Sequence, residues 1–219
     1  MGLSALVVFV VAQQPILLRV NPKVGATYRY RISTTGTALS AEGSFEFVAV
    51  LTEKLVSVKS GELTWDQKFN VEKGSGQGVF AKFGDSFKEM DGLEYQSMGP
   101  STGDVKKVRV SGVEVAAEGT SNVVFSPKPV KVGETWKAKV ESNGQFFNIR
   151  YMLKGTRVEK GRRIAEIEGK FADGQAVKTI KPMIALVDLA DGKLISVSSE
   201  FELSMGTVKL KGSYSVVRF

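Results

Sequence analysis

Apolar and polar side chains alternate along much of this chain. Tyr28, Tyr30 and Ile32 occupy every second position of one stretch, and Arg29 and Arg31 lie between them. The same alternation recurs in three later stretches, 135–141, 195–205 and 208–216. Successive side chains of a β-strand point to opposite faces, so this pattern predicts antiparallel strands with one face on a core and the other in water.

Pairs of residues that end in glycine separate the predicted strands. The pairs are Glu42-Gly43, Ser60-Gly61, Asn143-Gly144, Lys160-Gly161, Asp173-Gly174, Asp191-Gly192 and Met205-Gly206. Asn143-Gly144 and Asp191-Gly192 are the strongest hairpin signals, because glycine supplies the positive φ of tight turns. The intervening strands are long, at roughly 8–16 residues against a usual 5–6. Long strands in adjacent hairpins predict an all-β protein with a large curved antiparallel sheet, a half-barrel or flattened barrel.

One short phrase occurs twice, 108 residues apart, over 23–32 and 131–140. Both copies read Lys-Val-Gly-x-Thr-aromatic-basic-x-basic-aliphatic, which is a glycine turn that leads into an amphipathic strand. The repeat predicts two similar halves, 20–115 and 128–219, within one all-β domain that covers 13–219.

Few segments of the chain have a helical pattern. Phe80, Phe83 and Phe87 have helical spacing, so we expect at most one short helix there. Residues 97–104 predict a loop, and residues 116–129, which end in two prolines, predict the connection between the halves.

The N-terminus carries no charged side chain before Arg19. Residues 3–12 are apolar but too short to span a bilayer, which requires about 20 residues. They are typical of a signal peptide cleaved after Val10-x-Ala12, although a buried first strand is the alternative. We therefore expect residues 1–12 to be removed and the mature chain to be exported, soluble, and periplasmic or extracellular. The absence of cysteine excludes disulfides and a lipid anchor attached through cysteine.

The net charge of +7 is confined to the second half of the chain. Residues 13–103 carry 10 basic and 10 acidic side chains, whereas 104–219 carry 20 and 13. The densest basic segment predicts a basic face made of Arg150, Lys154, Arg157, Arg162 and Arg163. Such a face can attract anionic partners, or it can simply be a solvated strand surface, which the alternation with apolar residues favours. Tyr151 is the one aromatic nearby, which argues against nucleic acid as a partner.

The composition argues against catalysis and metal binding. With neither histidine nor cysteine, the chain lacks the base of a Ser-His-Asp triad and leaves only oxygen ligands for a metal. Three short motifs lack the context that their chemistry requires: Gly99-Pro100-Ser101-Thr102-Gly103 as a nucleophile elbow, Gly74-Ser75-Gly76-Gln77-Gly78 as a phosphate loop, and Asp188-x-x-Asp191-Gly192 as a calcium loop. We read them as a loop, a hairpin connection and a hairpin turn. No carboxylate pair stands out, and we predict no catalytic residue, cofactor or metal site.

Aromatic residues on the predicted strands are the best material for a binding site. They are Tyr28, Tyr30, Trp136, Phe147, Tyr151 and Phe171. If the sheet closes incompletely, such side chains line its concave face and form an apolar cavity for a small molecule. The alternative is that they fill an ordinary core.

The segment 125–136, Phe-Ser-Pro-Lys-Pro-Val-Lys-Val-Gly-Glu-Thr-Trp, resembles the Phe-Pro-x-Lys-Pro-Val-x-Val-Gly-Asp-x-Trp signature of a bacterial envelope family of unknown function. The stretches 23–30, 83–86 and 188–196 are similar to other parts of that family, so the resemblance covers roughly 20–219. It implies an exported all-β protein without assigned activity. Many members are lipoproteins, which this chain cannot be without a cysteine. A looser likeness is to periplasmic lipoprotein carriers, half-barrels that hold acyl chains.

Two functions of different kinds follow from these observations. The first is binding of a hydrophobic or lipid-like ligand in the concave face of the sheet. The second is an envelope structural or protein-interaction module that uses the basic outer face of residues 104–219. A hydrolase that uses carboxylates alone has the least support.

Overall fold

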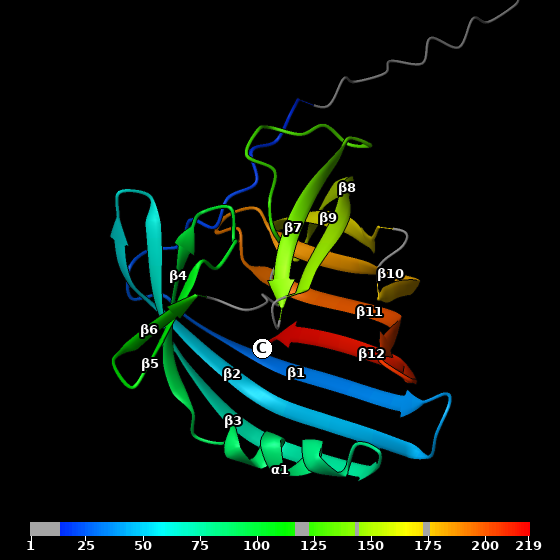
Figure 1. The fold of residues 1–219 in the computed structure, drawn as a ribbon. Helices are drawn as coiled ribbons and strands as arrows, with labels where there is room; N and C mark the ends of the chain where they lie inside the picture. The colour runs from blue at the N-terminus through cyan, green and yellow to red at the C-terminus, as the bar shows by residue number, and fades with distance from the viewer. Residues whose placement is uncertain (1–13, 117–122, 143–144, 173–175) are drawn as a thin grey trace, which may run out of the picture.

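The computed structural model describes residues 14–116, 123–142, 145–172 and 176–219 (Figure 1). The predicted signal peptide, the predicted turns Asn143-Gly144 and Asp173-Gly174, and residues 117–122 of the predicted connection lie outside the described residues.

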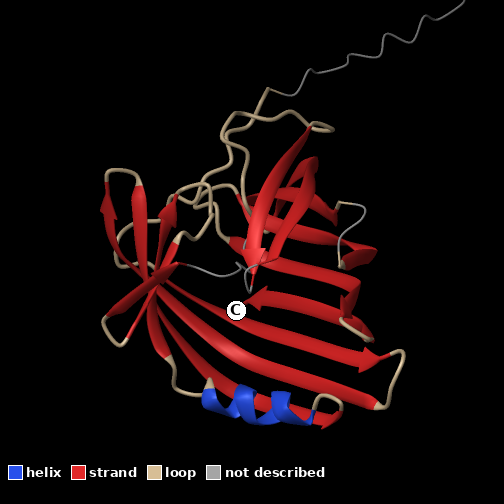
Figure 2. Cartoon of the chain, viewed as in Figure 1, coloured by secondary structure: helices blue, strands red, loops and turns tan. Residues whose placement is uncertain are grey.

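Twelve strands form one sheet in which every pair of neighbours is antiparallel (Figure 2). The elements are β1 (Thr27–Ala38), β2 (Gly43–Lys59), β3 (Glu62–Gly78), α1 (Ala81–Glu89), β4 (Glu94–Pro100), β5 (Lys107–Val110), β6 (Val113–Ala116), β7 (Thr135–Ser142), β8 (Gln145–Glu159), β9 (Arg162–Phe171), β10 (Val177–Asp188), β11 (Leu194–Met205) and β12 (Val208–Arg218). The order β6-β5-β4-β3-β2-β1-β12-β11-β10-β9-β8-β7 places each half on one side of the β1–β12 pair, with β6 and β7 at the two edges. This arrangement confirms the predicted fold class.

Alternation along the strands determines which face is buried. In β1, Tyr30 and Ile32 are buried, whereas Arg29 and Arg31 are exposed. Ile32 lies opposite Ala49 of β2 and Val216 of β12, both of which are also buried. The apolar face belongs to one core cluster that both halves share.

The sheet is curved rather than flat (Figure 1). Its pairing register shifts between Val48 and Ala49 in β2, between Leu153 and Gly155 in β8, and at three places in β10. An extra residue on one strand bends it and increases the local twist. These irregularities allow such long strands to curl, with β4–β6 on one side and β7–β9 on the other (Figure 1).

One end of the curled sheet is filled by two segments that contain no helix or strand. The first is 14–26 and the second is 123–134. Leu18 and Phe125 are 2% and 3% exposed, and Ile16 and Val130 pair in an isolated bridge that joins the two segments. The indole Nε1 of Trp136 donates a 2.7 Å hydrogen bond to a backbone carbonyl of the second segment. Residues 123–126 of the predicted connection are buried, and the Phe125 N–H donates a 2.8 Å hydrogen bond to the Thr102 carbonyl, so this part of the chain forms a plug. We call the end that it fills the plugged end.

The single short helix predicted near Phe80–Phe87 is α1, which packs against β2 and β3. The glycines of 74–78 belong to β3, so our reading of them as a hairpin connection is wrong. A Cβ on Gly76 would lie 2.0 Å from the Phe80 carbonyl oxygen, and one on Gly74 would lie 2.8 Å from Phe87 Cβ. These glycines let the helix approach the strand closely.

The prediction of a loop over 97–104 is wrong in its first half, because β4 continues to Pro100. Pairing with β3 overrides the local glycine and proline signals there. A Cβ on Gly99 would lie 2.3 Å from the Asp104 backbone oxygen, which shows how closely the chain folds back. The predicted turn Lys160-Gly161 is confirmed by positive φ at both residues.

Candidate functional site

A buried ion pair lies beside the plugged end of the sheet. Glu53 of β2 and Lys193, which precedes β11, are 3% and 7% exposed and bind each other directly. Gln67 donates a 3.1 Å hydrogen bond to the second carboxylate oxygen of Glu53. The Lys193 ammonium also lies 4.1 Å from the centre of the Trp65 ring. Each charge thus has a hydrogen-bond partner or an aromatic face in a site closed to water.

A second charged group adjoins this pair. The Tyr28 hydroxyl donates a 3.0 Å hydrogen bond to Asp191, and Arg218 binds Asp191 at 3.4 Å and Asp188 at 3.1 Å. Burial raises the pKa of Tyr28 above its ordinary value, and the adjacent Asp191 carboxylate raises it further. Burial and the nearby Glu53 carboxylate raise the pKa of Tyr30 in the same way. Both phenols therefore stay protonated at neutral pH, and the Tyr28 phenol acts as a donor.

The hollow beside the Glu53–Lys193 pair is small. Its volume is about 40 Å³, and Val20, Trp65 and Phe125 are among the residues that line it. Small-molecule pockets typically measure about 300–1,000 Å³, whereas a water molecule occupies about 30 Å³. This hollow is large enough for a water molecule but too small for a ligand of the size of an acyl chain.

Three of the predicted cavity-lining aromatics belong to the core. Tyr30, Trp136 and Tyr151 are 4%, 8% and 1% exposed. Trp136 and Tyr151 are cross-strand partners in β7 and β8 whose rings stack at 5.5 Å. Burial raises the pKa of Tyr151 to about 12. These side chains pack against other protein atoms, which is the arrangement of an ordinary core.

The other three predicted aromatics are half-buried. Tyr28 belongs to the Asp191–Arg218 group. Phe147 of β8 and Phe171 of β9 lie together, with ring centres 6.2 Å apart in an edge-to-face arrangement. The structure thus distributes the six predicted residues among the core, the charged group and the concave face near β8 and β9. Whether they bind a ligand remains a prediction.

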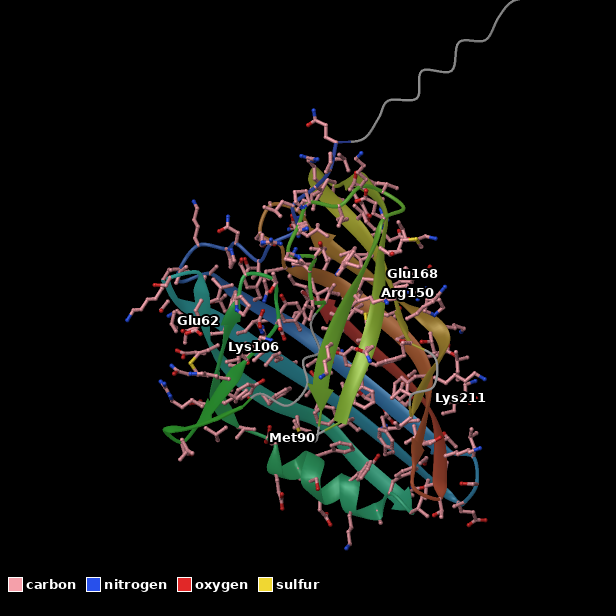
Figure 3. The ribbon with its side chains drawn as sticks, turned by 45° about the horizontal axis from the view of Figure 1, so that its top comes forward. Glu62, Met90, Lys106, Arg150, Glu168 and Lys211 are labelled. Atoms are coloured by element: carbon pink, nitrogen blue, oxygen red, sulfur yellow. The ribbon has the colours of Figure 1, made fainter. Side chains whose placement is uncertain are left out.

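A set of half-buried apolar side chains packs on the core from several elements. These side chains, which we call the concave lining, are Phe69 and Val71 of β3, Phe87 and Met90 at α1, Phe171 of β9, Met183 of β10 and Tyr214 of β12. Met90 lies at the end of α1 (Figure 3). Sequence analysis identified only Phe171 as a lining residue. Alternation places the strand members on the apolar face, but nothing local shows that they stay partly uncovered.

The predicted basic face is divided by carboxylates. Lys154 lies 3.7 Å from Glu168, and Arg157 binds Glu166 at 2.8 Å. Figure 3 shows Arg150 and Glu168 on the same part of the molecule. These glutamates belong to β9, which pairs with β8, so sheet pairing places acidic side chains beside the basic ones. Arg162 and Arg163 lie at the start of β9, opposite Glu159 and Val158 of β8.

Comparisons with known proteins do not identify a family. No protein-family model matches the chain, and no curated protein is similar to it in sequence. The envelope-family signature therefore remains a prediction. No helix in the described ranges is long and apolar enough to cross a membrane.

Three solved structures are similar to this chain at a low level. A structure of lipovitellin, determined to describe its lipid–protein interactions, is 10% identical over 90% of this chain, with a TM-score of 0.48, and this chain spans 25% of its length. A domain from Vibrio parahaemolyticus, described as an outer membrane lipoprotein-sorting protein domain, is 10% identical, with a TM-score of 0.27. The match covers 91% of this chain and 85% of that domain. A DUF1329 family protein from Desulfovibrio piger is 8% identical, with a TM-score of 0.30. The match covers 90% of this chain and 85% of that protein. None reaches a TM-score of 0.5, so these likenesses assign no function.

Proposed function

We propose that this protein is a non-catalytic binding protein that holds a hydrophobic or lipid-like ligand against the concave face of its sheet. The observation that carries the proposal is the concave lining, seven half-buried apolar side chains from β3, α1, β9, β10 and β12. Because residues 1–12 predict a signal peptide, we place the protein in the periplasm or outside the cell.

The concave lining differs from the core in how far it is covered. At the plugged end, Leu153, Ile167 and Val187 have no exposed surface. Met183, on the same face, packs beside the Tyr151 ring above Gly169 yet remains half-buried. Covering apolar surface is favourable by about 25 cal/mol per Å². Binding of an apolar ligand to this face removes apolar surface of both the ligand and the protein from water, and is therefore favourable.

The charged groups in the interior support binding rather than chemistry. Glu53 is bound to Lys193 and Gln67, and Arg218 is bound to two aspartates. A general acid or base must exchange a proton with a substrate, which requires access to it. All of these groups have protein partners, and the Glu53–Lys193 pair lies beside a hollow of only about 40 Å³. In our proposal they hold the fold together.

Native mass spectrometry of freshly purified protein tests the proposal first, because a tightly held lipid survives purification and adds its mass. Titration with the neutral apolar dye N-phenyl-1-naphthylamine then measures affinity. Replacing Met183 with Gln puts an amide on the concave lining and should weaken dye binding by about fivefold, equivalent to about 1 kcal/mol.

Met152→Gln is the matched control. Met152 is also half-buried, but it adjoins the fully buried Leu153 in β8 and therefore points to the opposite face. Its substitution should leave the dye affinity unchanged. Absence of both a co-purified ligand and saturable dye binding would refute the proposal.

A further inference from the structure

A larger hollow lies at the border of the sheet, away from the concave lining. Its volume is about 1000 Å³, at the upper end of the range for ligand pockets. It lies where β1 begins and β12 ends, beside the turns that join β8 to β9 and β10 to β11. Figure 1 shows the end of β12, marked C, near the middle of the molecule. We call this hollow the arginine groove, because Arg29, Arg162, Arg163 and Arg218 line it.

The carboxylates of the groove are already neutralised from within. Asp188 and Asp191 line it, and Arg218 binds both of them. Only 11% of the Arg218 side chain is exposed, so this ion-paired group forms a fixed part of the groove wall. One guanidinium balances one carboxylate, and Arg162, 3.9 Å from Asp188, supplies the second positive charge. The two aspartates therefore present little uncompensated negative charge to a ligand.

Arg29, Arg162 and Arg163 present exposed guanidinium groups to the groove, and Arg29 and Arg163 add positive charge beyond that needed to balance the aspartates. Arg29 is exposed and lies 4.9 Å from the centre of the Phe219 ring, where stacking holds its plane while its N–H edges stay free. The Arg162 side chain is 60% exposed, and Arg163 is exposed with no carboxylate within ion-pair distance among the described residues. A planar guanidinium binds two oxygens of a phosphate at once, with short charge-assisted hydrogen bonds.

Apolar groups border these charges. Leu189 and Ile195 are half-buried in the groove, and the Phe219 ring is exposed beside Arg29. The groove thus combines a positive surface with an apolar one. We propose that the arginine groove binds the phosphate group of a phosphate ester through Arg29, Arg162 and Arg163. The proposal does not depend on the ligand of the concave face.

Isothermal titration with two phosphate probes tests it. Inorganic phosphate represents free phosphate compounds, and dihexanoylphosphatidylglycerol, kept below its micelle concentration, represents a lipid head group. Both titrations use about 0.15 M NaCl, at which charges more than about 8 Å apart are largely screened. Arg162→Gln with Arg163→Gln should weaken binding by at least about tenfold, because two charge-assisted contacts are lost.

The matched control, Arg150→Gln with Lys154→Gln, removes the same charge from residues outside the groove. It should change the affinity by less than about twofold, because only screened long-range attraction is lost. Phosphate that binds at least as tightly as the lipid probe identifies free phosphate compounds as the source. If the lipid probe binds more tightly than phosphate, and Leu189→Gln removes this difference, the source is a lipid head group. Lack of saturable binding of either probe, or equal losses in both double variants, overturns the proposal.

Discussion

Replacing Lys193 with Met should strongly destabilise the fold. The substitution keeps an unbranched side chain against Trp65 but leaves the Glu53 carboxylate, 3% exposed, with Gln67 as its remaining hydrogen-bond partner. Breaking a buried ion pair from one side typically costs about 3–5 kcal/mol, because the remaining charge is desolvated without compensation. Loss of the cation–π contact with Trp65 contributes about 1 kcal/mol of this cost. We therefore expect the free energy of unfolding to fall by about 4 kcal/mol.

An exposed pair provides the contrast. Lys68 and Glu94 lie 2.7 Å apart, but their side chains are 48% and 69% exposed. Solvent-exposed pairs contribute little because water screens both charges, so Lys68→Met should leave the free energy of unfolding nearly unchanged. The two lysine substitutions are the same chemical change at a buried and at an exposed site. The difference between their losses in free energy of unfolding therefore measures the cost of a buried, unpaired carboxylate.

A double variant separates lost charge pairing from lost packing. Glu53→Gln combined with Lys193→Met removes both buried charges and keeps an amide oxygen that can accept the Gln67 hydrogen bond. Buried ion pairs replaced by neutral groups of similar size often cost little or nothing. The double variant should therefore recover at least half of the stability lost in Lys193→Met.

Urea unfolding followed by tryptophan fluorescence measures these effects, because Trp65 and Trp136 are both buried. With a slope of about 2–3 kcal/mol per molar urea, a loss of 4 kcal/mol lowers the midpoint by roughly 1.3–2 M. A Lys193→Met midpoint no lower than that of Lys68→Met would show that Glu53 is solvated or neutral in the folded protein, and the reasoning would be wrong.

Three further predictions concern packing, hydrogen bonding and pH. Gly76→Ala should lower the melting temperature by several degrees, because its Cβ would lie 2.0 Å from a carbonyl oxygen at the start of α1, whereas Gly155→Ala, with no atom within 4 Å of its Cβ, should leave it nearly unchanged in calorimetry. Trp136→Phe should cost about 1–3 kcal/mol in urea unfolding, because a buried backbone carbonyl loses its indole donor; a cost below about 0.5 kcal/mol would show that water replaces that donor. A hydrogen bond and positive charge from Lys170 lower the pKa of Glu168 in the folded state, so its stabilising contribution is present above about pH 4.3 and is lost as pH falls below that value. Glu168→Gln should therefore show a smaller loss of stability between neutral pH and acid, and an unchanged pH profile would contradict this reasoning.

Much of the local structure could be predicted from the sequence. Alternation identified the strand faces of Tyr30, Trp136 and Val216, because side-chain direction depends only on neighbouring residues. Glycine pairs such as Lys160-Gly161 marked turns for an equally local reason, which is positive φ. The turn at Ser111-Gly112, also with positive φ at both residues, was missed.

The candidate sites were harder to predict, because they depend on contacts between distant parts of the chain. Nothing near Lys193 in the sequence indicates that its partner is Glu53, and nothing near Tyr28 indicates Asp191, which is 163 positions away. The basic residues of β8 looked like one charged face until β9 placed glutamates beside them. The number of charges is a property of the composition, whereas their compensation is a property of the pairing.

The sequence by itself determined an antiparallel all-β protein, its strand faces and one short helix, since these follow from residue spacing within a few positions. Only the tertiary structure decided which apolar side chains fill the plugged end and which remain half-buried as the concave lining. It also decided that Arg29, Arg162 and Arg163 line one groove. The physical reason is that burial and net local charge are sums over neighbours in space, and the curling of the sheet brings together neighbours that lie far apart in the sequence.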